Sequence, residues 1–456
     1  MITTRKFLYS AAAAAVMALG VQSQAQAADF RGDCCADLEE RVAELEATTA
    51  RKGNRKVSLT ISGWVARELY VWDDGKLSDA YIVDTSTTLA THFKFSGEAQ
   101  MKPGWKAGFV IHIEQADAGS IFVDQTNDEG LGESVLNTLE AKWFIESERL
   151  GRITLGQQSH ASDNTAILAD FSGTLVQSNW VLFDGASFFL RPKGSHTLEG
   201  NRWGGSLGFC SSTGLGIGAD CNGLPLDAVR YDSPSFYGAV VSASWGENDF
   251  WDIAINYQAD WNSVRFKAAA AYNWFGDNKQ DPLLFNREAD GSYFQIGAMA
   301  MHTPTGLFLY GAYGSEDIND RFVRVNTAET ALQEVEDGDH WFVKAGIRRT
   351  WNSLGATVFY GEYGRYNDMY GGFNCGDTVS GTSIGDACLG GLTVTGSELE
   401  RYGFGIVQEI DAAAMSIWAK WVQLDGDISF EDQQSLKGTQ DYEKLDNFLV
   451  GALINF

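Results

Sequence analysis

Charged side chains at regular positions are the residues of this sequence that could act on ions or solutes. Basic residues occupy the polar phase of alternating segments, and three acids lie in a stretch without alternation, from about Ser159 to Leu226. Opposite charges across a narrow water-filled passage would orient water and solutes. The candidate acids are Asp163, Asp170 and Asp184, and the candidate basic residues are Lys94, Lys106, Lys142, Arg152, Arg230, Lys344 and Arg348. The alternative for any one of them is a solvated charge without effect on transport.

Residue patterns typical of catalysis are weak. Ser159, His160 and Asp163 include the residue types of acyl transfer, but a triad needs distant parts of the chain to meet. The glycine-rich stretch 214–218 lacks the flanking strand and helix of a phosphate-binding loop. No spacing of Cys and His suggests zinc. We therefore expect no enzyme, no metal site and no cofactor.

The segments that carry the basic residues alternate apolar and polar side chains, which is the pattern of β-strands. In the first of them, Val57, Leu59 and Ile61 alternate with Ser58 and Thr60. Sixteen such segments follow one another along the chain. They are 57–71, 92–101, 105–114, 135–146, 151–157, 228–232, 236–246, 251–258, 264–274, 293–302, 307–313, 340–351, 356–363, 399–410, 415–422 and 448–456.

One face of these strands is apolar, while Lys, Glu, Arg and His recur on the other. A soluble sheet would bury its apolar face against a second layer, and here lipid is the remaining partner. Beyond the first residues no apolar run approaches the ~20 residues of a membrane helix, and a closed barrel satisfies all backbone groups in hydrocarbon. We predict an all-β fold, a 16-stranded antiparallel transmembrane β-barrel with a water-filled interior. A soluble all-β propeller or solenoid is the alternative.

Connections and tryptophans agree with that prediction. Short turns alternate with mostly long loops, and short turns are expected at Pro103-Gly104, Ser233-Pro234, Asn262-Ser263, Pro304-Thr305, Asn352-Ser353 and Ala412-Ala413. Trp105, Trp261 and Trp351 fall beside short turns, and Trp72 and Trp274 fall near long loops. We expect these tryptophans to form the two aromatic girdles at the membrane interfaces.

The N-terminal residues are predicted to lie outside the barrel, which we place at 56–456. Arg5 and Lys6 precede an apolar run and small residues at 25–27, so 1–27 is expected to be a signal peptide for export through the periplasm. Its removal changes the net charge from −26 to −28, too acidic to favour nucleic acid. Segment 28–55 is expected to hold a short periplasmic helix capped by Asp37, either a trimer stalk or a frayed solvated helix.

Six cysteines in an exported chain indicate an oxidising compartment. Cys210 with Cys221, and Cys375 with Cys388, each bracket a Gly-rich loop segment, so we expect local disulfides there. Cys34 and Cys35 are adjacent, and their state stays open.

Several segments together carry a family resemblance. They are the stretch 34–46 (CCADLEERVAELE), 57–64 (VSLTISGW), 151–157 (GRITLGQ), 230–236 (RYDSPSF) and the final Phe456. The sequence resembles the outer-membrane porins of alphaproteobacteria, of the rhizobial and brucella type. The resemblance implies a homotrimeric channel in the outer membrane for passive diffusion of small hydrophilic solutes, with a third loop folded inward to narrow the pore.

The resemblance also implies partners. These are outer-membrane lipid and lipopolysaccharide, the barrel assembly machinery and peptidoglycan. Phe456 is expected to be the C-terminal signal for the assembly machinery, and Ala28 and Asp29 are the expected point of attachment to peptidoglycan. A structural protein that anchors the membrane to the cell wall remains the alternative function.

Overall fold

The computed structural model describes residues 57–86, 88–115, 119–130, 136–199, 202–204, 225–246, 250–275, 290–319, 321–326, 329–333, 337–368, 393–431 and 437–456. They belong to one compact unit, Lys52–Phe456. The expected signal peptide, the N-terminal helix and all six cysteines lie outside the described residues.

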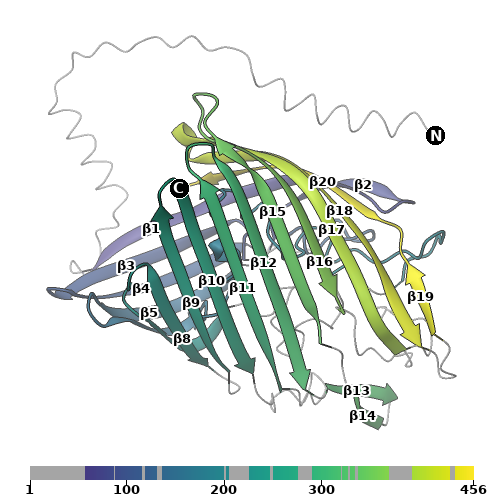
Figure 1. Cartoon of the computed structure of the whole chain (residues 1–456), viewed down its shortest axis with the longest axis horizontal. Coiled ribbons are helices and arrows are strands. Elements are labelled where there is room, and N and C mark those ends of the chain that lie inside the picture. Colours follow the sequence, from purple (N-terminus) through teal and green to yellow (C-terminus); the bar gives the residue numbers. More distant parts are fainter. Residues whose placement is uncertain are drawn as a thin grey trace. The chain divides into compact units, whose positions relative to one another are not determined.

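All sixteen predicted strands are present and form one antiparallel sheet (Figure 1). They are β1 (Ser58–Asp73), β3 (His92–Lys102), β4 (Trp105–Gln115), β5 (Leu136–Ser147), β6 (Gly151–Gln158), β7 (Leu226–Asp232), β8 (Ala239–Gly246), β9 (Trp251–Trp261), β10 (Val264–Phe275), β11 (Asp290–His302), β12 (Leu307–Asn319), β15 (Asp339–Arg349), β16 (Thr357–Asn367), β17 (Thr393–Ile410), β18 (Met415–Glu431) and β20 (Leu445–Asn455).

Four further strands lie in the connections. The strand β2 (Ser78–Val83) pairs antiparallel with the end of β1, and β19 (Lys437–Asp441) pairs antiparallel with the end of β18. The strands β13 (Arg321–Asn326) and β14 (Glu329–Gln333) form a separate hairpin. Within the described residues, no helix combines the length and the apolar character needed to cross a bilayer.

The first and last strands close the sheet into a barrel. β1 pairs with β3 along its first half and with β20 along its second, where Leu69 faces Val450. The backbone N–H of Gly63 donates to the carbonyl of Phe456 at 3.1 Å, and the N–H of Phe456 donates back at 3.1 Å. The C-terminal residue is therefore part of the closure, and the barrel has no free edge.

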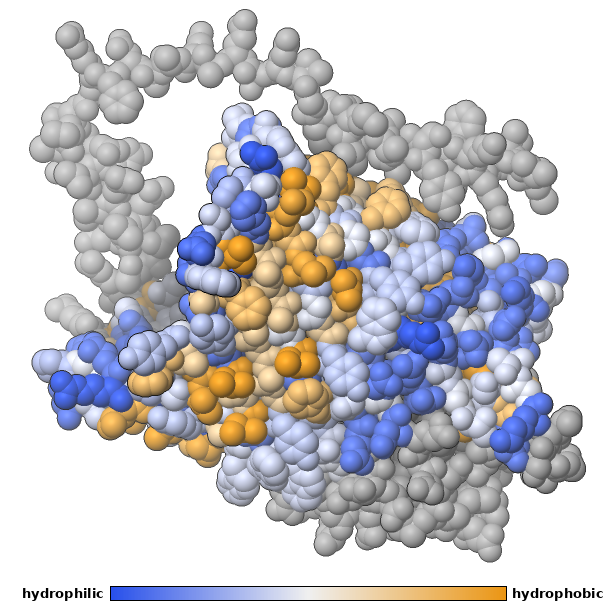
Figure 2. Space-filling model, in the orientation of Figure 1, coloured by the Kyte–Doolittle hydropathy of each residue, from blue (hydrophilic) through white to orange (hydrophobic). Residues whose placement is uncertain are grey.

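Side chains alternate across the barrel wall as predicted. On β9, Ile253 and Ile255 are exposed, whereas Asp252 and Ala254, which alternate with them, are buried. Figure 2 shows apolar side chains gathered over the strands of one outer face, with hydrophilic residues toward the strand ends. Because the apolar phase faces outward, the barrel presents its hydrophobic surface to lipid.

Some strands are longer than the apolar pattern indicates. β17 begins at Thr393 rather than near Leu399, and β18 continues to Glu431. The added segments carry charged residues such as Glu398, Asp425 and Asp427, and an ion pair joins Arg365 to Glu398 there. The apolar pattern ends where the surface becomes polar, although the hydrogen-bonded ladder continues.

Two of the three tryptophans predicted beside short turns are exposed, whereas Trp72, predicted near a long loop, is buried. Trp261 and Trp351 are exposed outside the barrel, next to the turns after β9 and β15. Trp72 is only 2% exposed, and its ring packs 5.1 Å from that of Phe188. It shares the inward phase of Tyr70, so it contributes to the core instead of the membrane interface.

Candidate functional site

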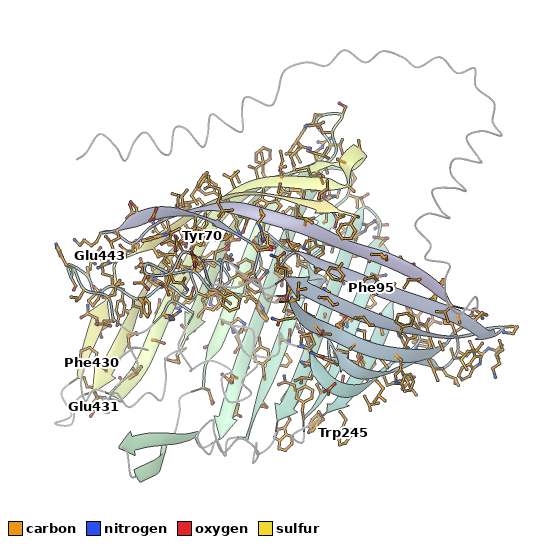
Figure 3. The ribbon with its side chains drawn as sticks, turned by 180° about the vertical axis from the view of Figure 1, so that it is seen from behind. Tyr70, Phe95, Trp245, Phe430, Glu431 and Glu443 are labelled. Carbon is orange, nitrogen blue, oxygen red and sulfur yellow. The ribbon has the colours of Figure 1, made fainter. Side chains whose placement is uncertain are left out.

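The predicted acids lie in the connection between β6 and β7, residues 159–225, of which 159–199, 202–204 and 225 are described. The connection contains a short helical turn, η1 (Ile167–Ala169). It contacts inner-face side chains from β1, β9, β11, β12, β15 and β18. In Figure 3, side chains crowd beside Tyr70, whose ring lies 5.7 Å from that of Phe188 in the connection.

The start of the connection is fixed by buried polar contacts. His160 Nδ1 lies 2.7 Å from Asp252 Oδ2, and the backbone N–H of Ser162 donates to the same oxygen at 2.6 Å. The predicted wall residue Arg230 donates to the carbonyls of Ser159 and His160 at 3.0 and 2.9 Å. These groups hold the chain against β7 and β9. His160 pairs with Asp252, whereas Ser159 donates to Asp163, so the structure does not join Ser159, His160 and Asp163 in the order of a triad.

Two of the three acids pair with lysines of the late wall, by which we mean the inner faces of β15 to β18. Asp170 accepts from Lys344 Nζ at 2.6 Å, and this ammonium also donates to Thr174 and to the carbonyl of Ser178. Asp184 accepts from Lys420 Nζ at 2.6 Å. Lys344 has no exposed side-chain surface. Both pairs are shielded from water by the connection itself.

A third buried cation completes the late wall. Arg401 pairs with Glu362 at 2.7 Å and donates to the carbonyls of Asn179 and Val181. The sequence reasoning missed Arg401 and Lys420, although both occupy the inward phase of their predicted strands. That phase was the available signal, because Lys420 lies in the same phase as the buried Trp418 and Val422.

Arg348 anchors the connection at Ser172 and Gly173. Its guanidinium pairs with Glu409 at 2.6 Å and donates to the carbonyl of Ser172 at 3.0 Å. The next residue, Gly173, has a φ of +87°, and a Cβ there would lie 1.8 Å from Arg348 Nη1. Glycine is therefore required for the chain to pass this close to the arginine.

The other predicted basic residues lie on the early wall, the inner faces of β3 to β6. Lys94 and Lys142 lie 3.9 and 2.5 Å from Glu140, and Lys106 lies 3.3 Å from Glu98. The side chain of Lys94 is 37% exposed. The guanidinium of Arg152, above the ring of Phe144 at 3.6 Å, completes this wall. These cations are partly balanced by neighbouring carboxylates and keep contact with water.

Among the described residues, Asp163 forms no close ion pair with the lysines of either wall. It accepts hydrogen bonds from Ser159 Oγ and, at 2.7 Å, from Asn164 Nδ2. Burial raises the pKa of the Asp163 carboxyl, and His160, Ser159 and Arg230 partly offset this shift. In the part of the chain that the structure describes, no ion pair joins Asp163, Asp170 or Asp184 to the lysines of the early wall.

A family model decides the identity of this barrel. The model described as Gram-negative porin matches residues 10–411. The chain belongs to the Gram-negative porin family. It is an outer-membrane protein that forms a channel for passive diffusion of small hydrophilic solutes and ions, and its family and fold indicate a channel rather than an enzyme.

Solved structures of outer-membrane proteins are similar to this porin, and one of them has a TM-score above 0.5. An anion-selective porin from Comamonas acidovorans is 14% identical with a TM-score of 0.54, over 88% of this chain and 100% of that chain. OmpT from Vibrio cholerae is 10% identical with a TM-score of 0.49, over 89% of this chain and 99% of that chain. A search of curated protein sequences finds no match.

The distal part of the porin's β6–β7 connection packs beside the β1–β2 turn. Arg191 pairs with Asp74 at 2.7 Å, and both side chains are buried. Burial would raise the pKa of Asp74, but hydrogen bonds from Arg191 and from the backbone of Leu77 and Lys76 outweigh it, and the pKa is lowered. Tyr442 donates to Glu199 at 2.8 Å. The connection is thus attached at both the barrel wall and the outer turns.

Proposed function

We propose that the β6–β7 connection is an inward-folded third loop that narrows the channel, and that solutes pass along the early wall. One observation carries this proposal. The late-wall cations Lys344 and Lys420 are buried by the connection, whereas Lys94 of the early wall remains 37% exposed. An exposed, incompletely balanced lysine acts on passing ions, and a buried neutral pair exerts little field on them.

In this proposal, the lysines of the early wall determine whether the porin prefers anions or cations. Lys94, Lys106 and Lys142 share one inward phase, so neutralising all three to Gln shifts selectivity toward cations. Reversal potentials of the purified protein in a planar bilayer under a KCl gradient measure this shift. An unchanged ratio of cation to anion permeability would remove the three lysines from the pore lining.

The remaining partners are proposals that rest on the sequence resemblance. We infer a homotrimer of the alphaproteobacterial type, inserted by the barrel assembly machinery through Phe456 and surrounded by lipopolysaccharide. Single-channel records with three equal closing steps would support three pores in one particle. Attachment to peptidoglycan through Ala28 and Asp29 and the two loop disulfides are further proposals, testable by mass spectrometry of the mature protein.

A further inference from the structure

A cavity of about 310 Å³ lies between the β6–β7 connection and the barrel wall at β1, β3, β4 and β5. The barrel wall contributes Trp64, Lys94 and Glu140, and the connection contributes Asp163 and Leu168. This is the early-wall side, where the proposed passage runs.

One half of the cavity is apolar. Leu168 is 48% exposed although its neighbour Ile167 is buried. When an apolar solute covers an exposed leucine, apolar surface is removed from water and the free energy falls. Across the cavity the indole of Trp64 is held in place by a hydrogen bond from Nε1 to the carbonyl of Leu89 at 3.1 Å. A rigid ring and an uncovered leucine therefore offer surface to a compact apolar group.

The other half presents a cation. Lys94, His112 and Glu140 face one another across β3, β4 and β5. Glu140 is bound more closely by Lys142, at 2.5 Å, than by Lys94, at 3.9 Å. His112 Nε2 is buried without a hydrogen-bond partner among the described groups. The ammonium of Lys94 is therefore the charge most available to a solute.

The acids near the cavity are already engaged. Glu140 is closely paired with Lys142, and Asp163 accepts from Ser159 and Asn164 while buried. A cationic solute would have to compete with these partners. An anion that also carries an apolar body finds both a cation and an uncovered apolar surface.

We propose that this cavity is a subsite for small organic carboxylates with a compact apolar body, a class that benzoate represents. The carboxylate approaches Lys94, and the ring covers Leu168 and Trp64. The inference rests on the proposed passage along the early wall and adds the class of solute that the passage favours.

The test compares benzoate with acetate in bi-ionic reversal potentials of the purified porin. In a pore without a subsite, the larger benzoate permeates less readily than acetate. We expect the permeability ratio of benzoate to acetate to exceed the ratio of their mobilities in free solution. Leu168→Ser lowers that ratio by about threefold, as expected when part of one apolar contact is lost. Lys94→Gln lowers the permeability of both carboxylates relative to potassium.

Matched controls separate the subsite from general effects. Phe171→Ser alters an apolar residue of the same connection that lines a different cavity, beside β9 and β10, and leaves the benzoate ratio unchanged. Two results at normal KCl conductance would overturn the subsite but not the channel. One is a benzoate-to-acetate permeability ratio at or below the ratio of their mobilities in free solution, and the other is a permeability ratio that Leu168→Ser does not change. A protein silent in KCl would overturn the proposed passage and the subsite together.

Discussion

The early and late walls carry the same residue types in the same inward phase, yet their environments differ. On the early wall, Lys94 and Lys106 are each 37% exposed, whereas Lys344 and Lys420 on the late wall are 0% and 4% exposed. The difference arises from one connection, which covers the late wall and leaves the early wall wet. Strand alternation thus determines which side of the barrel a charge faces, and a distant segment determines whether that charge meets solutes or holds the loop.

The largest effect is expected at Arg401 of the late wall. Arg401→Met removes the cation beside the buried Glu362 carboxylate, which keeps its hydrogen bond from Ser178, and removes the donor to two carbonyls of the connection. Breaking a buried pair in this way costs about 3–5 kcal/mol. Thermal unfolding in detergent, followed by circular dichroism, measures the loss. The double variant Arg401→Met with Glu362→Leu removes both charges and is expected to recover part of it. A single variant as stable as the wild type would show that the late wall is not an anchor.

A smaller loss is expected at Gly173, with Gly194 as its matched control. Both glycines have positive φ, +87° and +79°, but a Cβ at Gly173 meets Arg348 whereas one at Gly194 meets nothing within 4 Å. Gly194→Ala costs about 1 kcal/mol from backbone strain. Gly173→Ala costs roughly 1–2 kcal/mol more, because Arg348 must leave the carbonyl of Ser172. Equal losses in the two variants, measured by denaturant unfolding, would contradict the close contact.

Acid is expected to weaken the outer attachment of the connection. The pKa of Asp74 is lowered from its ordinary value of 3.8 in the folded protein. Its carboxylate therefore adds stability above pH 4, and this contribution is lost as pH falls through the lowered pKa. Asp74→Asn lowers the stability at pH 7, and this loss becomes progressively smaller below pH 4. Unfolding curves of both proteins between pH 7 and pH 2 should converge, and a constant difference would contradict this assignment.

The smallest change in stability is expected on the early wall. Lys106 lies 3.3 Å from Glu98, and both side chains are well exposed. Lys106→Gln therefore changes the free energy of unfolding by about 0.5 kcal/mol or less. Denaturant unfolding of Lys106→Gln and Arg401→Met in the same detergent compares the contributions of the two walls to stability. A loss as large as that of the late-wall variant would remove the distinction between them.

The fold was predictable from the sequence because each strand repeats a pattern with a period of two residues. The same period placed Lys94, Lys106 and Lys142 on one face of neighbouring strands, where the structure has them. It could not assign partners across the barrel, because the pairing of Lys344 with Asp170 spans 174 residues and depends on the path of the connection. Trp72 was misassigned although it shares the inward phase of Tyr70, and Phe188 of that connection packs against its ring.

The central claim is that ions meet the early wall and not the late wall, and reversal potentials test it most directly. Two variants are compared with the wild type in one KCl gradient, Lys94→Gln and the double variant Lys344→Met with Asp170→Leu. The structure predicts a shift toward cations for Lys94→Gln and no shift for the double variant, which removes a buried neutral pair. A shift for the double variant with none for Lys94→Gln would contradict the claim.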